Sequence, residues 1–395
     1  MNTRTIELAA SRRAVLGGLA LGGLAMTGAG RALASSAPAS DALVYFGMHG
    51  SQIHAARFDT RRGTLSPIGV AAEQSAPTWG ILHPAGEVVY YVREDGNEGW
   101  ESGAVVAYRI DRTSGRLQRI GETIAQGGGT THLHLDAPSM TLLATNFGGS
   151  TVSTIPIRSD DGLGPVSSVL IEHGSGPMKR QGSSHPHGVA VDPTGRFALV
   201  PDLGADRIFV HRFDRQTRAL RYDRPDRHLD YVAAPGSGPR HVLFHPGGRV
   251  MFALTELSGE LLTFGWNGET GELTLIDARS TSSAGFSGER SSSELAISAD
   301  GTKLYLTDRS ENTIVVHAID PATGKLTLLQ RLSCGGDFPW HFAIDPAGSW
   351  MLVANEKSSR VEVFAIDRAS GRVSPTRNGL DLPRPVHILF AGEIA

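Results

Sequence analysis

The apolar residues of this chain gather in short runs that are separated by turns bearing proline and glycine. One stretch, His185–Gly204, contains two predicted strands, residues 188–192 and 196–202, joined by the tight turn Asp192-Pro193-Thr194-Gly195. Apolar and β-branched runs of this length are typical of strands, and Pro-x-Gly punctuation sets the reversal between them. No segment after residue 34 shows a convincing amphipathic helical period, so the pattern predicts an all-β fold.

The same two-strand pattern recurs along the chain at a nearly constant spacing. Its seven copies begin at Pro77, Thr130, Pro186, Pro239, Ser292, Pro339 and Pro385. Each of the first six copies continues into a third strand and a shorter fourth strand, which gives an antiparallel four-stranded unit. A period near 50 residues with strand-type units predicts a β-propeller.

The two ends of the chain supply complementary half-copies of the repeat. Residues 42–50 match a second strand without a first, and residues 385–390 match a first strand without the rest. Paired in one blade, they would close the ring and leave no open sheet edge. The sequence therefore predicts a seven-bladed β-propeller in one domain, residues 35–395. An open two-sheet sandwich would not explain the complementary half-copies.

The first 34 residues resemble a twin-arginine export signal. Arg12 and Arg13 precede a mild apolar stretch, and Ala32-Leu33-Ala34 offers a cleavage site of small residues. The apolar stretch is too short and rich in glycine for a comfortable membrane span, so we expect cleavage rather than a stable anchor, and a periplasmic or secreted protein. Removal of four arginines and one glutamate takes the formal net charge from −3 to about −6, which gives no reason to expect nucleic acid as a partner.

Antiparallel pairing brings the start of a first strand and the end of a second strand to the same end of a blade. The second positions of the first strands are Thr78, Thr131, His187, Arg240, Ser293, Trp340 and Val386, and the third positions are Trp79, His132, Gly188, His241, Glu294, His341 and His387. The predicted last residues of the second strands are Arg93, Asn146, Asp202, Glu256, Asp308 and Asn355, and Arg309 follows one residue further. Polar groups thus crowd one mouth of the axial channel, where we expect the site.

Two arginines, a histidine and two carboxylates around one channel suit a small anionic or carbonyl substrate. These five residues are His187, Arg240, Glu256, Glu294 and Arg309. A structural alternative has comparable weight for each of them alone, because groups at blade ends often cap loop amides or pair with a neighbouring arginine.

Four runs of the sequence resemble the seven-bladed lactonase family, which includes propeller-type 6-phosphogluconolactonases and fungal carboxy-muconate lactonising enzymes. They are HPHGVAVDPTGRFALVPDLGADRI, GPRHVLFHPGG, SSELAISADG and PWHFAIDPAG, and the resemblance extends over about residues 42–390. A His, an Arg, a Glu and a further Arg at the channel mouth are that family's proposed active residues. The matching positions here are His187, Arg240, Glu256 and Arg309.

The resemblance implies hydrolysis of a small sugar-type lactone. Glu256 or His187 would take the proton of the attacking water, and Arg240 would stabilise the oxyanion. Arg309, helped by His241, would hold a carboxylate or phosphate of the substrate. Further candidates for substrate binding are His185, Asp202, His241, Glu294, Asp308 and His341.

Other readings of the same residues remain open. A muconate-type lactonising cycloisomerase would use the same arginines on a carboxylate substrate, and a non-catalytic exported propeller would bind a small anion or a protein. The pairs His185-x-His187 and His132-x-His134 could hold a metal, but isolated spacings of this kind are weak signals, so we expect no metal. No nucleotide-binding fingerprint occurs, so we expect no cofactor, and the single cysteine, Cys334, fits a buried thiol.

Overall fold

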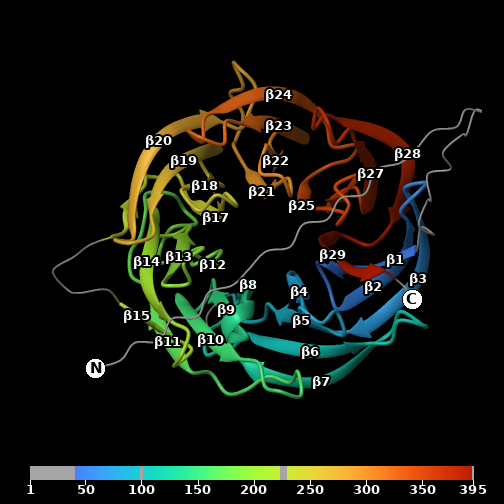
Figure 1. Ribbon diagram of the computed structural model, residues 1–395, viewed down its shortest axis with the longest axis horizontal. Coiled ribbons are helices and arrows are strands. Elements are labelled where there is room, and N and C mark those ends of the chain that lie inside the picture. The colour runs from blue at the N-terminus through green and yellow to red at the C-terminus, as the bar shows by residue number, and fades with distance from the viewer. Residues whose placement is uncertain (1–40, 98–100, 223–228, 394–395) are drawn as a thin grey trace, which may run out of the picture. The chain divides into compact units, whose positions relative to one another are not determined.

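The computed structural model describes residues 41–97, 101–222 and 229–393, and these form a seven-bladed propeller of antiparallel sheets (Figure 1). The proposed export signal, residues 1–34, lies outside the described residues. The one helical element described is a short 3-10 turn, Ala137–Ser139. None of the described residues belongs to a helix long and apolar enough to cross a membrane. The predicted all-β fold and the number of blades are confirmed.

Each blade is a sheet that runs from an inner strand to an outer strand. Blade 1 contains β29 (Pro385–Glu393), β1 (Asp41–Met48), β2 (Gln52–Asp59) and β3 (Thr64–Glu73). Blade 2 contains β4 (Gly80–Leu82), β5 (Val88–Arg93), β6 (Ala104–Ile110) and β7 (Leu117–Ile124). Blade 3 contains β8 (Thr130–Asp136), β9 (Thr141–Asn146), β10 (Thr151–Pro156) and β11 (Ser168–Ile171).

The remaining four blades follow in chain order. Blade 4 contains β12 (Ala190–Val191), β13 (Phe197–Asp202), β14 (Arg207–Asp214), β15 (Ala219–Arg221) and β16 (Tyr231–Val232). Blade 5 contains β17 (Pro239–Phe244), β18 (Val250–Thr255), β19 (Glu260–Asn267) and β20 (Glu272–Ser280). Blade 6 contains β21 (Ser292–Ile297), β22 (Lys303–Asp308), β23 (Thr313–Ile319) and β24 (Leu326–Ser333). Blade 7 contains β25 (Pro339–Ile344), β26 (Trp350–Asn355), β27 (Arg360–Ile366) and β28 (Val373–Asp381).

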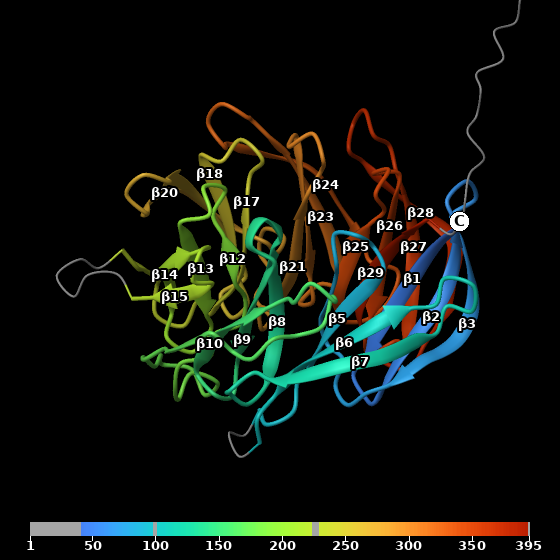
Figure 2. The same ribbon diagram turned by 60° about the horizontal axis from the view of Figure 1, so that its bottom comes forward.

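The C-terminal strand closes the ring as the half-copies predicted. β29 pairs antiparallel with β1, with Phe46 opposite Ile388 and Met48 opposite Pro385. Figure 2 shows these two strands side by side although they lie at opposite ends of the chain. The pairing removes both open edges that the chain ends would otherwise leave.

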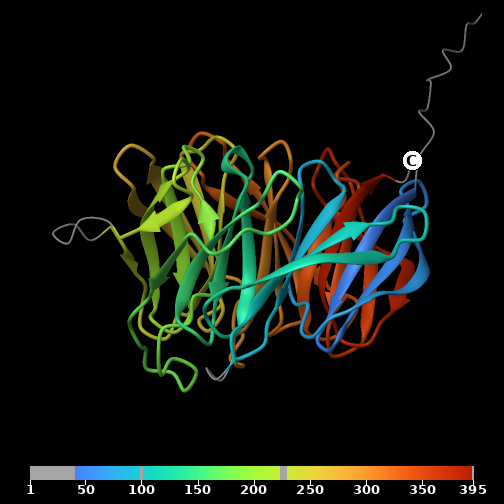
Figure 3. The same cartoon turned by 90° about the horizontal axis from the view of Figure 1, so that it is seen from below.

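The start of each first strand faces the end of its second strand, as antiparallel order requires. Pro239 pairs with Thr255, and Pro339 pairs with Asn355. The strands run between the two faces of the ring in side view (Figure 3). All such strand ends therefore meet at one mouth of the channel, and the turns between first and second strands lie at the other face.

The inner strand of blade 4 is shorter than the five residues predicted from sequence. β12 is only Ala190–Val191, although the His187 N–H still donates to the Pro201 carbonyl at 3.0 Å. Pro201 has no N–H to return a hydrogen bond to the facing strand, which interrupts the ladder at this point.

Apolar residues form seven clusters, and each cluster lies between two adjacent blades. The cluster that contains Phe46 and Ile388 of blade 1, for example, also contains Leu352 and Val363 of blade 7. Such a fold draws its stability from interfaces between neighbouring repeats rather than from one central core.

We expect Ile388→Ala in the closing strand to lower the free energy of unfolding by about 2–5 kcal/mol, because the side chain is only 2% exposed in the cluster between blades 1 and 7. The matched control is Ile276→Ala on the outer strand β20, whose side chain is 50% exposed and whose loss should change stability by less than about 0.5 kcal/mol. Urea unfolding of both variants measures the difference, and equal effects would contradict the role given to ring closure.

Candidate active site

A cavity of about 670 Å³ opens at the mouth where first strands begin and second strands end. Its wall includes the second-position side chains Thr78, Thr131, His187, Arg240, Trp340 and Val386, and the third-position side chains Trp79, His241, Glu294 and His341. The two columns that the repeat pattern placed at one mouth thus supply much of the lining of one cavity.

A third column contains the residue that follows each second strand. Glu256 belongs to this column, although we predicted it as the last residue of its second strand. In every blade the backbone N–H of the residue in this column donates to the carbonyl of the residue that precedes the corresponding copy of the repeat. The column consists of His49, Glu94, Phe147, Leu203, Glu256, Arg309 and Glu356. Glu256 therefore shares a column with Arg309, and Thr255 is the residue that ends β18. The pairs Pro239–Thr255, Ser292–Asp308 and Pro339–Asn355 have equal spacing in the sequence, so the repeat itself is the signal that could have placed Glu256 correctly.

Glu256 receives three guanidinium groups at the cavity wall. Its Oε2 lies 3.0 Å from Arg240 Nε and 2.7 Å from Arg309 Nη2, and its Oε1 accepts from Arg180 Nη1 at 2.5 Å. Burial acts to raise the pKa of Glu256, but Arg309, Arg180 and Arg240 outweigh it and hold the pKa well below its usual value. Glu256 is therefore a permanently ionised carboxylate that fixes three cations.

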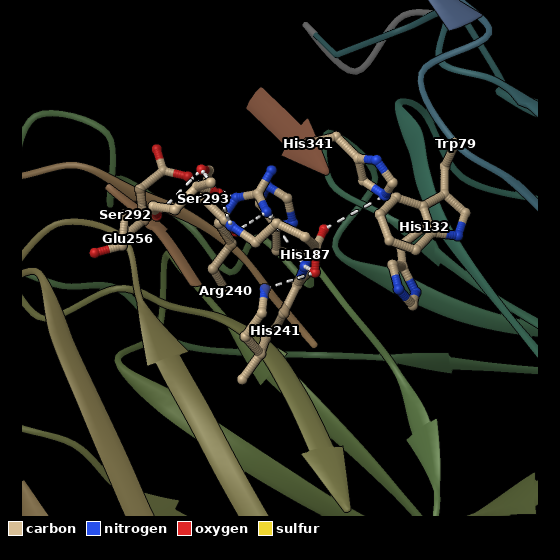
Figure 4. A network of polar contacts seen from close by, with 12 residues as sticks. Trp79, His132, His187, Arg240, His241, Glu256, Ser292, Ser293 and His341 are labelled. Carbon is tan, nitrogen blue, oxygen red and sulfur yellow. Dashed lines mark hydrogen bonds and ion pairs between the residues drawn. The ribbon is translucent and has the colours of Figure 1, made fainter. Parts of the chain in front are cut away.

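Arg240 and Arg309 are held from a second side by backbone carbonyls of β21. Arg240 donates to the Ser293 carbonyl, and Arg309 donates to the Ser292 carbonyl at 2.9 Å. Burial and the neighbouring Arg309 lower the pKa of Arg240 to about 10, so its guanidinium stays charged at neutral pH. Figure 4 shows Arg240 at the centre of this network.

Arg309 also contacts two neighbouring aromatic rings at the cavity wall. Its guanidinium carbon lies 5.0 Å from the ring centres of both Phe338 and Trp340. Such cation–π contacts attract the guanidinium to the ring faces. The contacts leave Arg309 little freedom to follow a substrate group.

Five of the third-position side chains form an aromatic layer across the channel, and three of them, Trp79, His241 and His341, line the cavity. The Trp79 ring lies 4.2 to 5.3 Å from the rings of His132, His241, His341 and His387. Burial is the main cause that lowers the pKa of each of these four histidines, so that they are neutral at pH 7. Figure 4 shows Trp79, His132 and His341 side by side.

In blade 4 the third position is Gly188, and the absence of a side chain there leaves room for Arg240 and His241 of blade 5. A Cβ on Gly188 would lie 2.9 Å from the Arg240 carbonyl oxygen and 3.0 Å from His241 Cδ2. The preceding residue, His187, lines the cavity and is buried beside His241, with ring centres 5.1 Å apart. Burial, followed by Arg240, lowers the pKa of His187 well below its usual value, and its Nδ1 has no hydrogen-bond partner among the described residues.

Three predicted substrate-binding residues do not line the cavity: His185, Asp202 and Asp308. Asp202 accepts from the backbone N–H groups of His185 and Ala205 at 2.8 Å each. Asp308 accepts from the Ser310 N–H at 2.8 Å and from the Ser282 hydroxyl at 3.0 Å. These carboxylates cap loop backbone, which is the structural alternative that the sequence left open. His185 places Nδ1 2.8 Å from the Phe147 carbonyl oxygen and stacks on the Phe147 ring.

Two features of the site were not found by sequence reasoning. Arg180 reaches Glu256 from the long loop between β11 and β12, where no repeat pattern marks it. Trp79 had been placed in its column, but its central position among the histidines follows only from the three-dimensional ring.

The described residues contain no group of three or more His, Cys, Asp or Glu side chains that could hold a metal ion. Cys334 is fully buried, so the predicted buried thiol is confirmed, and burial raises its thiol pKa to about 11.

Comparison with known proteins gives one consistent result. The family model described as "Lactonase, 7-bladed beta-propeller" matches residues 42–390. A 6-phosphogluconolactonase of Bacillus subtilis is 26% identical over 342 residues, which cover 87% of this chain and 95% of that protein. A 6-phosphogluconolactonase of Sodalis glossinidius is 31% identical over 325 residues, which cover 82% of this chain and 91% of that protein. The solved structure of PpgL, a periplasmic gluconolactonase of Pseudomonas aeruginosa, has a TM-score of 0.83 at 33% identity and covers 90% of this chain and 100% of that chain.

We expect Glu256→Gln to lower the free energy of unfolding by about 3–5 kcal/mol at pH 7, because two buried guanidiniums lose their counter-ion. The folded-state pKa of Glu256 is depressed, so its stabilisation is present above the unfolded pKa and is lost as the pH falls through the folded pKa. Arg180→Gln, which removes the half-exposed third cation, should cost less than about 1 kcal/mol. Urea unfolding at several pH values measures both, and a fully stable Glu256→Gln variant would contradict this account.

Proposed function

The chain belongs to the seven-bladed β-propeller lactonase family, and on that basis we propose that it hydrolyses a small sugar-type lactone in the cavity at the mouth of the axial channel. The observation that carries the proposal is the buried Arg240 guanidinium, fixed by Glu256 and the Ser293 carbonyl at the cavity wall. The names of the relatives, 6-phosphogluconolactonase and gluconolactonase, support a sugar lactone as the substrate class.

Lactone hydrolysis forms a bond from a water oxygen to the carbonyl carbon and breaks the bond from that carbon to the ring oxygen. Negative charge develops on the carbonyl oxygen, and the leaving alkoxide needs a proton. A preorganised cation in a dry site stabilises such an oxyanion without reorganisation at the moment of reaction. Arg240 fits this role because its charge is buried and two protein oxygens hold its orientation.

Glu256 acts in this proposal as a positioning residue rather than as the base. Three guanidiniums occupy its oxygens and keep it ionised, so it is a weak proton acceptor. His187, the other candidate base, is also a weak one because its pKa is lowered well below its usual value. Its unpartnered Nδ1 suits a hydrogen bond to a substrate hydroxyl or carbonyl group.

The charge balance of the cavity favours an uncharged lactone over a phosphorylated one. The described lining includes four cations, Arg180, Arg240, Arg309 and Lys357, and five acidic residues, Glu94, Glu256, Glu289, Glu294 and Asp337. Three of the cations share Glu256, and Lys357 lies over the Phe338 ring at 3.9 Å. A phosphate dianion or the carboxylate of a muconate-type substrate would therefore find little free positive charge.

The test is hydrolysis of free and 6-phosphorylated aldonolactones by the mature chain, Arg240→Gln and Arg180→Gln. We expect the wild type to prefer the free lactone in kcat/KM. Arg240→Gln should lower kcat by about 10²–10³-fold through loss of oxyanion stabilisation, and Arg180→Gln should lower it far less. Circular dichroism checks the fold of each variant. No activity on any lactone, or equal losses in the two variants, would refute the proposal.

We also propose that the chain is exported with residues 1–34 as a twin-arginine signal. The twin arginines and the cleavage site in the sequence support this, as does the periplasmic location in the name of PpgL. Amino-terminal sequencing of protein from the periplasm should begin near Ser35. Joint replacement Arg12→Lys and Arg13→Lys should retain the uncleaved precursor in the cytoplasm, and normal export of that variant would count against the assignment.

A further inference from the structure

Four glutamates line the cavity: Glu289 is exposed at its rim, and the oxygens of the other three have different partners. Glu256 is bound by three guanidiniums. One oxygen of Glu94 accepts a hydrogen bond from the Thr78 hydroxyl. The other accepts from Asn97 Nδ2 at 3.0 Å. Glu294 has one oxygen held and one free: Oε1 accepts from the Leu295 N–H at 3.0 Å, while Oε2 has no hydrogen-bond partner among the described residues.

Neutral rings surround the Glu294 carboxyl group. His241 Nδ1 of β17 lies 3.1 Å from Oε1, and His341 Nε2 of β25 lies 3.9 Å from Oε2, too far for a hydrogen bond. Arg240 of β17 contacts the His241 ring nitrogens at 3.2 and 3.4 Å instead of pairing with Glu294. Glu294 is therefore a carboxyl group that is 6% exposed, fixed by one oxygen and not neutralised by an ion pair.

We propose that Glu294 is the general base that activates the attacking water, with Oε2 as the proton acceptor and His241 and Leu295 holding its other oxygen. This assignment rests on the proposed lactone hydrolysis. A base needs a fixed lone pair that no other group occupies, and among the four cavity glutamates only Glu294 is both buried and has an oxygen without a hydrogen-bond partner within the described residues.

The protons balance through one residue. Oε2 takes a proton from water as the water oxygen bonds to the lactone carbon, and Arg240 faces the resulting oxyanion. The same proton passes from Glu294 to the ring oxygen as the carbon–oxygen bond breaks, which restores the carboxylate. The new carboxylic acid then releases its proton to solvent.

The electrostatics of the group agree with this geometry. Burial raises the pKa of Glu294, against the opposing effects of His341, Arg240 and the Leu295 N–H. A carboxylate with a raised pKa is a stronger base than an ordinary one. Glu256 differs because its ion pairs move its pKa in the other direction.

The experiment compares hydrolysis with hydroxylaminolysis of the same aldonolactone. Hydroxylamine is a much stronger nucleophile than water, attacks without a base, and releases an N–H proton that the ring oxygen can take as it leaves, whereas both reactions need the oxyanion to be stabilised. Glu294→Gln should lower kcat for hydrolysis by about 10²–10⁴-fold and retain most of the hydroxylaminolysis. Arg240→Gln should lose both reactions. Equal loss of both in Glu294→Gln, or no loss of hydrolysis, would overturn the assignment.

The pH profile gives a second readout that a structural role would not produce. The base must be ionised, so kcat/KM of the wild type should fall as the pH drops through the Glu294 pKa, which lies above 4.5. Glu294→Gln should lack this acidic limb, while Glu289→Gln, a charge-matched change at the exposed cavity rim, should retain it. An unchanged limb in Glu294→Gln would overturn the proposal.

Thermal unfolding shows whether Glu294→Gln is folded, and Glu294→Asp serves if it is not. The aspartate variant should keep the acidic limb with a reduced kcat, because its carboxylate is set back by one methylene; loss of the limb in this variant would contradict the role. A wild type that hydrolyses no lactone would overturn the proposed function and this assignment together. Wild-type activity with an unaffected Glu294→Gln variant would overturn the assignment alone.

Discussion

The pairing of β29 with β1 is the constraint on which the rest of the molecule depends. Every apolar cluster is shared by two adjacent blades, so each blade obtains its buried surface only when it has a neighbour on both sides. Closure also places three columns of side chains around one mouth, because each blade repeats the same antiparallel register. The site is therefore a property of the ring, and no single blade contains it.

Two buried glutamates at the cavity wall differ in their partners. Glu256 and its three arginines form a saturated cluster in which each charge is fixed by others, which gives Arg240 a defined direction. The His241 ring contacts both Arg240 and Glu294. The neighbours of the Glu294 carboxyl group are neutral imidazoles rather than cations. A fixed cation for the oxyanion and an unpaired carboxylate for the proton are what ester hydrolysis requires of a dry site.

The sequence predicts the fold almost completely because each blade carries the same signals. The half-copies at the chain ends predict the closing strand, and strand alternation places Arg240, His241 and Glu294 at the mouth. The spacing from the start of a copy to the end of its second strand is the same for Pro239–Thr255, Ser292–Asp308 and Pro339–Asn355, so the repeat indicates Thr255 as the last residue of β18, and the prediction of Glu256 there was wrong by one residue. Nor can it show that Asp202 caps loop amides, or that Arg180 reaches across from a loop without a repeat.

The most direct test of this account is a crystal structure of Glu294→Gln with a free aldonolactone bound. The account predicts the lactone in the cavity above Trp79, with its carbonyl oxygen within hydrogen-bond distance of the Arg240 guanidinium and a water between residue 294 and the carbonyl carbon. A lactone bound at the opposite face of the ring, or one whose carbonyl oxygen points away from Arg240, would contradict it.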